Sequence, residues 1–208
     1  MIAVALNGAG LRLGESRILH PLRLQIEAGE CVAIIGPSGA GKTSLLRLII
    51  GLDRPSAGEV RLAGRLCRSE ADFRAERPRI GYLFQDSDDQ LFSPTVIEDV
   101  AFGPLNLSLP RREAFTRATA QLADFGLSHL ADRPVHRLSG GEKRLVCLAG
   151  LFVMRPRVLL LDEPTNALDE EAEARLIAHL QSFRGALILS THDAGLPERL
   201  GARVLQLR

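Results

Sequence analysis

The sequence predicts an α/β fold, a parallel sheet with a helical insert, in a chain of 208 residues. Segments with strand and helix patterns alternate along the chain, which favours this class. Strand candidates such as VLLL and ALILS are continuous apolar runs, typical of parallel strands that are buried on both faces. Residues 86–156 contain more helix and less strand pattern. We therefore expect one domain, with a core at 1–85 and 157–208 and a helical subdomain at 86–156.

The N-terminal part contains strand patterns and one helix that follows a glycine-rich loop. Residues 22–35 hold two strand patterns separated by a turn at Ala28-Gly29. The stretch TSLLRLII has helical length and composition, and Gly51 with DRPSAG ends it. The segments EVRLAG and IGYLF predict two further strands.

The second half contains the helix patterns. Residues 86–110 carry three prolines, so we expect no long regular element there. The stretch RREAFTRATAQLADFGL predicts an amphipathic helix with a stop at Gly126, and Ser139 is expected to cap a helix that runs towards Met154. A buried strand VLLL, a helix DEEAEARLIAHLQSF and two strands, ALILS and RVLQL, complete the chain.

Composition excludes several classes of protein. The 46% hydrophobic content can form a core, and the 25% charged residues sum to only +1, which argues against disorder and against nucleic-acid binding. The longest apolar stretch, 145–154, is shorter than the ~20 residues a membrane span needs. The N-terminus lacks a basic start, so no signal peptide is expected. The three cysteines are widely spaced and predict reduced thiols.

A phosphate-binding loop is the first motif that carries chemistry. Its glycines let successive backbone N–H groups point at phosphate oxygens, and the helix that follows adds its positive dipole end. Lys42 would reach the β- and γ-phosphates, and the Thr43 hydroxyl would bind Mg²⁺. The alternative, a chance glycine-rich turn, arises in about one percent of chains of this length. The candidate nucleotide-binding residues are Gly36, Pro37, Ser38, Gly39, Ala40, Gly41, Lys42, Thr43 and Ser44.

Two carboxylates, Asp162 and Glu163, follow the apolar run VLLL. Ligands of doubly wound sheets lie at the carboxyl ends of strands. Asp162 is suited to hold Mg²⁺ and Glu163 to polarise the water that attacks the γ-phosphate. The alternative is an ordinary charged strand end before a turn at Pro164. The phosphate loop earlier in the chain makes the catalytic interpretation the better one.

A second anion site is predicted where Ser139, Gly140 and Gly141 begin a helix. Adjacent glycines after a serine expose backbone N–H groups at the positive end of that helix. The alternative is a flexible capped turn. A head-to-tail dimer, in which each chain's Ser139 segment closes over the ATP of its partner, would reconcile two phosphate-binding elements with one nucleotide motif.

The motifs together resemble the ATP-binding subunit of ATP-binding-cassette (ABC) transporters. The stretches GPSGAGKTS, LSGGEKR and VLLLDEP resemble the Walker A, signature and Walker B motifs, and NALD and STHD resemble the D-loop and the switch-histidine segment. Gln85 matches the Q-loop glutamine. The resemblance covers nearly the whole chain. It implies a P-loop nucleotide hydrolase with a RecA-like parallel core, an N-terminal antiparallel β part and a helical subdomain.

The resemblance also implies roles for single residues. Gln85 would touch Mg²⁺ or the attacking water, His192 would contact the γ-phosphate, and Asp169 would lie at the dimer interface. Without the resemblance, a structural role would be favoured for His192. The implied cofactors are ATP and Mg²⁺, with Thr43, Gln85 and Asp162 as metal ligands. The implied partners are transmembrane transporter subunits and a second cassette, identical or paralogous, at the cytoplasmic face of the cell membrane.

Residues 81–107, GYLFQDSDDQLFSPTVIEDVAFGPLNL, resemble the energy-coupling-factor group, which imports cobalt, nickel or vitamins. The cobalt/nickel type is the nearest match, although Ser87 replaces the usual proline. The segment would expose apolar side chains in a groove that receives a helix of a membrane protein. Alternatively, these side chains pack the helical insert. They are Leu91, Phe92, Val96 and Phe102.

One position departs from the family pattern. Leu13 stands where an aromatic residue normally stacks on adenine, and no aromatic residue precedes Phe73. A missing stack would cost roughly 1–3 kcal/mol. We therefore hypothesise weak discrimination between ATP and GTP.

Two other function classes fit parts of the sequence. A small-molecule kinase would share the phosphate loop but has no use for LSGGEKR. A cassette ATPase of DNA repair or translation would carry a coiled-coil insert or a second cassette, and the near-neutral charge disfavours both. The sequence leaves the transported substrate and the homodimer or heterodimer choice open.

Overall fold

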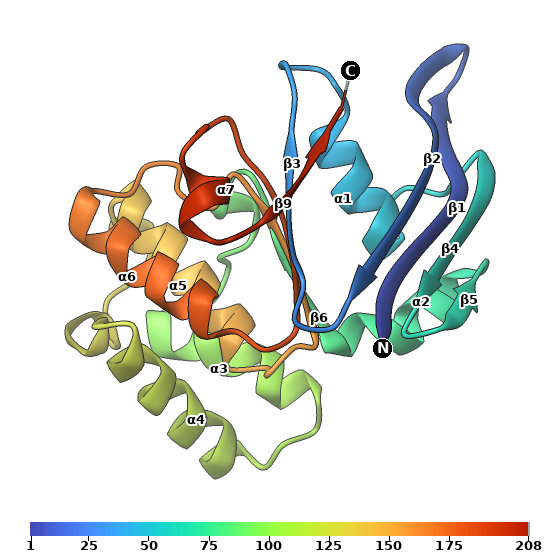
Figure 1. Cartoon of the computed structure of the whole chain (residues 1–208). Helices are drawn as coiled ribbons and strands as arrows, with labels where there is room; N and C mark the ends of the chain where they lie inside the picture. Colours follow the sequence, from blue (N-terminus) through green and yellow to red (C-terminus); the bar gives the residue numbers. More distant parts are fainter. Residues whose placement is uncertain (208) are drawn as a thin grey trace. The chain divides into compact units, whose positions relative to one another are not determined.

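The computed structural model describes residues 1–207, which form two compact units (Figure 1). The first unit comprises Met1–Tyr82, Arg157–Glu163 and the chain from Ser182 onward. The second comprises Leu83–Pro156 and Pro164–Gln181. Residues 164–181, expected with the core, thus group with the helical segment. One contact within this unit is the His179 ring, which stacks on Phe125 with ring centroids 4.0 Å apart.

The first unit contains an antiparallel and a parallel sheet. The antiparallel sheet has the order β2-β1-β4-β5, and the other sheet has the order β6-β7-β8-β3-β9. Its pairs β7–β8, β8–β3 and β3–β9 are parallel. The elements are β1 (Ile2–Leu13), β2 (Ser16–Glu27), β3 (Cys31–Ile35), α1 (Lys42–Ile50), β4 (Ala57–Leu62), β5 (Arg65–Cys67), α2 (Glu70–Glu76), β6 (Ile80–Leu83), β7 (Val158–Asp162), β8 (Ala186–Ser190), α7 (Leu196–Arg199) and β9 (Arg203–Gln206).

Helix α1 joins these two sheets into one core. It contacts β7 and β8 of the parallel sheet and β1 and β2 of the antiparallel sheet. Leu45, Leu48 and Ile49 on α1 are buried, as are all residues of β7 and β8. Strands buried on both faces require continuous apolar sequence, which is why VLLL and ALILS were recognisable. The carboxyl ends of β3, β7 and β8 lie together, since Thr191 N–H donates to Ile34 O.

The second unit is helical. Its helices are α3 (Val96–Asn106), α4 (Arg111–Asp124), α5 (Gly140–Phe152) and α6 (Glu170–Ser182, whose last residue groups with the first unit). Helices α3, α4 and α5 pack on one another. The predicted apolar face of α4, with Ala114, Ala118 and Leu122, is fully buried. Ser139 caps α5 as predicted, and Gly126, with φ +71°, follows the end of α4.

One expectation about residues 86–110 is wrong. The segment contains the eleven-residue helix α3 despite Pro104. A proline in the last turn removes only one helical hydrogen bond, and the first N–H groups of the helix donate to Arg133 O and Ala131 O. Val96 begins this helix and is fully buried, which agrees with the alternative that these apolar side chains pack the helical insert.

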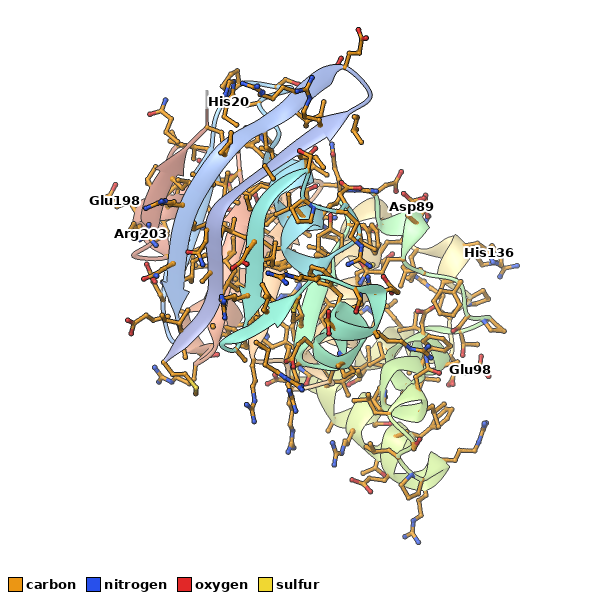
Figure 2. All side chains as sticks on the ribbon, turned by 90° about the vertical axis from the view of Figure 1, so that its right-hand side faces the viewer. His20, Asp89, Glu98, His136, Glu198 and Arg203 are labelled. Atoms are coloured by element: carbon orange, nitrogen blue, oxygen red, sulfur yellow. The ribbon has the colours of Figure 1, made fainter. Side chains whose placement is uncertain are left out.

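Strand β1 and helix α2 were not predicted. The pattern of β1 is interrupted where Gly8 adopts φ +66° and the register with β2 shifts between Asn7 and Ala9. A bulge of this kind disrupts the alternation by which a strand is recognised. The labelled His20 lies on the neighbouring strand β2 (Figure 2).

Within residues 1–207, none of the helices combines the length and the apolar character needed to cross a bilayer.

Candidate functional site

The phosphate loop connects β3 to α1. Lys42, the first residue of α1, donates from Nζ to Gly36 O at 2.9 Å and to Pro37 O at 3.2 Å. The ammonium group is thereby held across the loop. No side chain among the described residues caps α1 at Gly41, so the backbone N–H groups of its first turn suit an anionic ligand. Anions favour this end of a helix.

Glycines in this loop are required by backbone conformation and by space. Gly39 and Gly41 have φ angles of +78° and +90°, values that residues other than glycine rarely adopt. A Cβ atom on Gly41 would lie 2.6 Å from Leu19 Cδ2, and one on Gly36 would lie 2.7 Å from Leu207 O. Leu19 of β2 and Leu207, which follows β9, therefore leave no space for side chains at Gly41 and Gly36.

Asp162 ends β7 and is only 1% exposed. Its Oδ1 accepts a hydrogen bond from Ser190 Oγ at 2.5 Å. Ser190 ends β8, is fully buried, and its Oγ also accepts from Glu163 N–H at 3.1 Å. Ser190 thus connects the two predicted acidic residues. Ser190 is the first residue of the STHD stretch, and no role of its own was predicted for this polar residue at the end of an apolar strand.

Glu163 follows Asp162 with φ +50°, a conformation that non-glycine residues adopt at a cost. Its Oε2 lies 2.8 Å from His192 Nδ1 and accepts a second hydrogen bond from His192 N–H at 3.2 Å. A charged carboxylate has no proton to donate, so an ionised Glu163 requires the proton on Nδ1. The His192 side chain is 71% exposed.

The predicted second anion site lies at the start of α5. Ser139 Oγ accepts from Glu142 N–H, and Glu142 Oε2 accepts from Ser139 N–H at 2.7 Å. The Ser139 N–H lowers the pKa of Glu142. A Cβ atom on Gly141 would lie 2.9 Å from Ala167 O. Only glycine therefore allows the D-loop backbone to approach α5 this closely.

A hollow of about 440 Å³ lies in front of this helix start, within the second unit. Ser139, Gly140 and Gly141 line it together with Asp169. The basic residues His129 and Arg175 line the hollow beside the carboxylates of Glu142 and Asp169, so the positive end of α5 is the feature that favours an anion there. The structure therefore brings the predicted signature and D-loop residues to one concave surface at a helix N-terminus.

Gln85 is exposed in the second unit, directly after β6. Its carbonyl accepts from the Arg144 guanidinium at 3.1 Å, and the Phe84 carbonyl accepts from the same nitrogen at 2.6 Å. Arg144 is buried on α5 and also donates to Pro164 O at 3.4 Å. The sequence predicted no role for Arg144. The sequence did contain one indication that Arg144 is buried, namely its position directly before the apolar run LVCLAGLF.

The predicted residues thus fall into two groups. The first unit holds the phosphate loop, Asp162, Glu163 and His192. The second unit holds Gln85, Asp169 and the 139–141 segment. Leu13 is 59% exposed at the end of β1.

An exposed aromatic pair lies on the second unit. Phe92 and Phe102 pack edge to face with centroids 4.6 Å apart, and Phe92 is 63% exposed. Asp99 fixes the backbone beneath them by accepting from the N–H groups of Phe92 and Ser93. Burial raises the pKa of Asp99.

Comparisons with known proteins agree on one family. A family model described as ABC transporter matches residues 19–166. The cobalt import ATP-binding protein CbiO of Rhodobacter capsulatus is 47% identical over 94% of this chain and 71% of its own length. The nickel import ATP-binding protein NikO of the same organism is 42% identical over 91% of this chain and 79% of its own length.

Two further comparisons extend this result. An energy-coupling factor transporter ATP-binding protein of Methanothermobacter thermautotrophicus is 42% identical over 91% of this chain and 62% of its own length. The solved structure of CbiO1 from Clostridium perfringens, part of the ABC transporter complex CbiONQ, is 32% identical with a TM-score of 0.87 and covers 100% of this chain and 85% of that one. The chain therefore belongs to the ABC transporter family and is one of its ATP-binding, ATP-hydrolysing cassettes.

Proposed function

We propose that this chain is the ATP-hydrolysing subunit of a membrane importer of the energy-coupling-factor type, for cobalt or nickel ions. The observation that carries the proposal is the arrangement of Asp162, Glu163 and His192 at the carboxyl ends of β7 and β8. Relatives named for cobalt import, nickel import and an energy-coupling factor support the choice of transporter.

The catalytic chemistry is transfer of the γ-phosphoryl group to water. Lys42 and the amides of the loop bind the phosphates and neutralise their charge, which supplies most of the catalysis in such reactions. Glu163 accepts the proton of the attacking water through its carboxylate. His192 orients that carboxylate through the Nδ1–Oε2 contact of 2.8 Å. Glu163 N–H donates to Ser190 Oγ, and Ser190 Oγ donates to the buried Asp162, so the backbone of Glu163 is fixed beside its neighbour.

The donors of the first unit fit Mg²⁺, because Thr43 and Asp162 offer hydroxyl and carboxylate oxygens, the ligands that this hard cation prefers. When bound, the ion would neutralise charge on the β- and γ-phosphates. Ser190 prepares Asp162 for this role by fixing one of its carboxylate oxygens at 2.5 Å.

Dimerisation is proposed to complete the site. The Ser139–Gly141 segment and Asp169 line one hollow of the second unit. In an ATP-bound dimer, with an identical or a paralogous cassette, this surface would bind the γ-phosphate held by the loop of the other chain. Closure of the dimer would act on transmembrane subunits, and hydrolysis would reset it.

The exposed Phe92–Phe102 pair is the proposed contact with the membrane subunits, at the cytoplasmic face of the cell membrane. Both rings are large and accessible, and an apolar surface of this kind suits a helix laid into a groove.

Co-purification tests the transporter assignment. The tagged chain is expressed in its native host, membranes are extracted gently, and associated proteins are identified by mass spectrometry. We expect a multi-helix scaffold subunit and a substrate-binding membrane protein, whose bound ligand names the substrate. A soluble nucleic-acid or ribosomal partner would contradict the transport assignment and leave the ATPase assignment intact.

A further inference from the structure

Arg144 is buried in a part of the second unit where most neighbours are apolar. It is 2% exposed, and the residues that follow it on α5, from Leu145 to Ala149, are buried as well. A buried guanidinium is stable only when hydrogen bonds compensate its lost hydration. Its burial in the core of the second unit therefore requires hydrogen-bond acceptors for the guanidinium N–H groups.

Three of its acceptors are backbone carbonyls of two segments that carry function. Arg144 donates to Phe84 O at 2.6 Å, to Gln85 O at 3.1 Å and to Pro164 O at 3.4 Å. Gln85 is the Q-loop residue, and Pro164 directly follows Glu163. The planar guanidinium has five N–H groups in a fixed fork, so one side chain can hold both segments at once.

These carbonyls lie next to the points where the chain changes units. The chain leaves the first unit after Tyr82 and again after Glu163. Phe84 and Pro164 are among the first residues that follow these crossings. Arg144 therefore ties the beginnings of both segments to the helix whose own N-terminus, Ser139 to Gly141, is the second anion site.

Neighbouring side chains of α5 hold the same Q-loop. Lys143 Nζ pairs with Asp88 Oδ1 at 2.5 Å, and Cys147 Sγ contacts Ser87 O at 3.8 Å. The side chain of Gln90 closes the loop by accepting from Phe84 N–H at 3.2 Å. The loop after Gln85 is thus attached to α5 by three side chains, of which Arg144 and Cys147 are buried.

We propose that Arg144 is a positioning residue for ATP hydrolysis, which fixes the backbone of Gln85 and Pro164 to the helix that begins at the signature segment. The inference rests on the proposed role of Gln85. Arg144 acts through Gln85 rather than on nucleotide, so its loss affects the chemical step and leaves binding by the phosphate loop of the first unit unchanged.

The test measures kcat, KM and nucleotide affinity of the full chain with Arg144→Met, which keeps the apolar stem and removes every donor. We expect kcat to fall at least tenfold and the Kd for ATP to stay within twofold. Arg144→Lys, which can still donate to one or two carbonyls, should recover part of kcat. If Arg144→Met does not fold, Arg144→Lys against wild type provides the same comparison.

Arg77→Met is the matched control. Arg77 also donates to two backbone carbonyls, those of Ile50 and Gly51, but at the far end of α1. Its loss should lower the melting temperature and leave kcat within twofold. An equal loss of kcat in Arg77→Met and Arg144→Met would overturn the proposal, since both would then act through general stability.

A double-mutant cycle with Gln85→Ala separates the inference from the function it rests on. If Arg144 acts through Gln85, the double variant is no more than two- to threefold slower than the slower single variant. Effects that multiply would overturn the role of Arg144 alone. A Gln85→Ala variant with unchanged kcat would overturn the role of Gln85 and this inference with it.

Discussion

Replacing Ser190 by alanine tests whether its hydrogen bonds hold Asp162 and Glu163 in place. Ser190 Oγ is fully buried, donates to Asp162 Oδ1 at 2.5 Å and accepts from Glu163 N–H at 3.1 Å. A hydrogen bond to a charged group contributes about 1.5–3 kcal/mol. Glu163 N–H keeps Ser190 O as an acceptor at 3.2 Å, so the loss concerns mainly the bond to Asp162. We expect a destabilisation of ~2 kcal/mol.

Two assays follow from this magnitude. A loss of ~2 kcal/mol lowers the melting temperature by roughly 4–8 °C in a chain of this size. Because the freed carboxylate is also less well oriented, kcat should fall about tenfold, which corresponds to ~1.4 kcal/mol in the barrier. The exposed Ser128→Ala is the control and should change neither quantity measurably. A Ser190→Ala variant as stable and as active as wild type would refute this account of the acidic pair.

Three further predictions concern single positions. Gly41→Ala should destabilise the chain by about 1–3 kcal/mol and weaken ATP binding, because Gly41 has a φ of +90° and a Cβ atom there would clash with Leu19. The control, Gly150→Ala, lies in open space on α5 and should stabilise the chain in urea unfolding. The opposite order of stabilities would contradict the loop geometry. The pKa of Glu142 is lowered in the folded chain, so the ionised carboxylate stabilises the fold above pH 4.5, and this stabilisation is lost as the pH falls further. The difference in unfolding free energy between wild type and Glu142→Gln should therefore shrink on acidification. A constant difference would count against the capping role of Glu142. Wild type should bind GTP nearly as well as ATP, and Leu13→Tyr should tighten binding by roughly 1–3 kcal/mol in competition titrations; a strong ATP preference in wild type would contradict the hypothesis.

Local patterns made the motifs of this chain recognisable. The phosphate loop, the 139–141 segment and the pair Asp162–Glu163 each lie within a few consecutive residues. Their conformations are set by local chemistry, such as positive φ at Gly41 and the capping box of α5. The buried strands were equally recognisable, because short continuous apolar runs are typical of strands that are buried on both faces.

Long-range contacts account for what the sequence did not predict. Ser190 meets Asp162 across 28 residues of chain, and Arg144 meets Phe84 across 60. Nothing in either local pattern specifies these partners. Helix α3 was missed for a similar reason, since its N-terminal N–H groups are satisfied by Ala131 and Arg133, carbonyls of another segment. The sequence pattern therefore showed the helix breaker Pro104 but not the tertiary contacts that stabilise the helix.

Glu163→Gln tests the central claim most directly, that Glu163 is the group that activates water. Glutamine keeps the size of the side chain, and its carbonyl oxygen can still accept from His192 Nδ1, whose contact with Oε2 is 2.8 Å. The variant loses the negative charge and with it the capacity to take a proton, which contributes about 10²–10⁴-fold in rate. The measurement is phosphate release by the full chain, with ATP binding and dimer lifetime recorded in parallel. We expect ATP binding to persist, a long-lived ATP-bound dimer to form and turnover to fall at least a hundredfold. Unchanged turnover would remove Glu163 from the reaction and contradict the account.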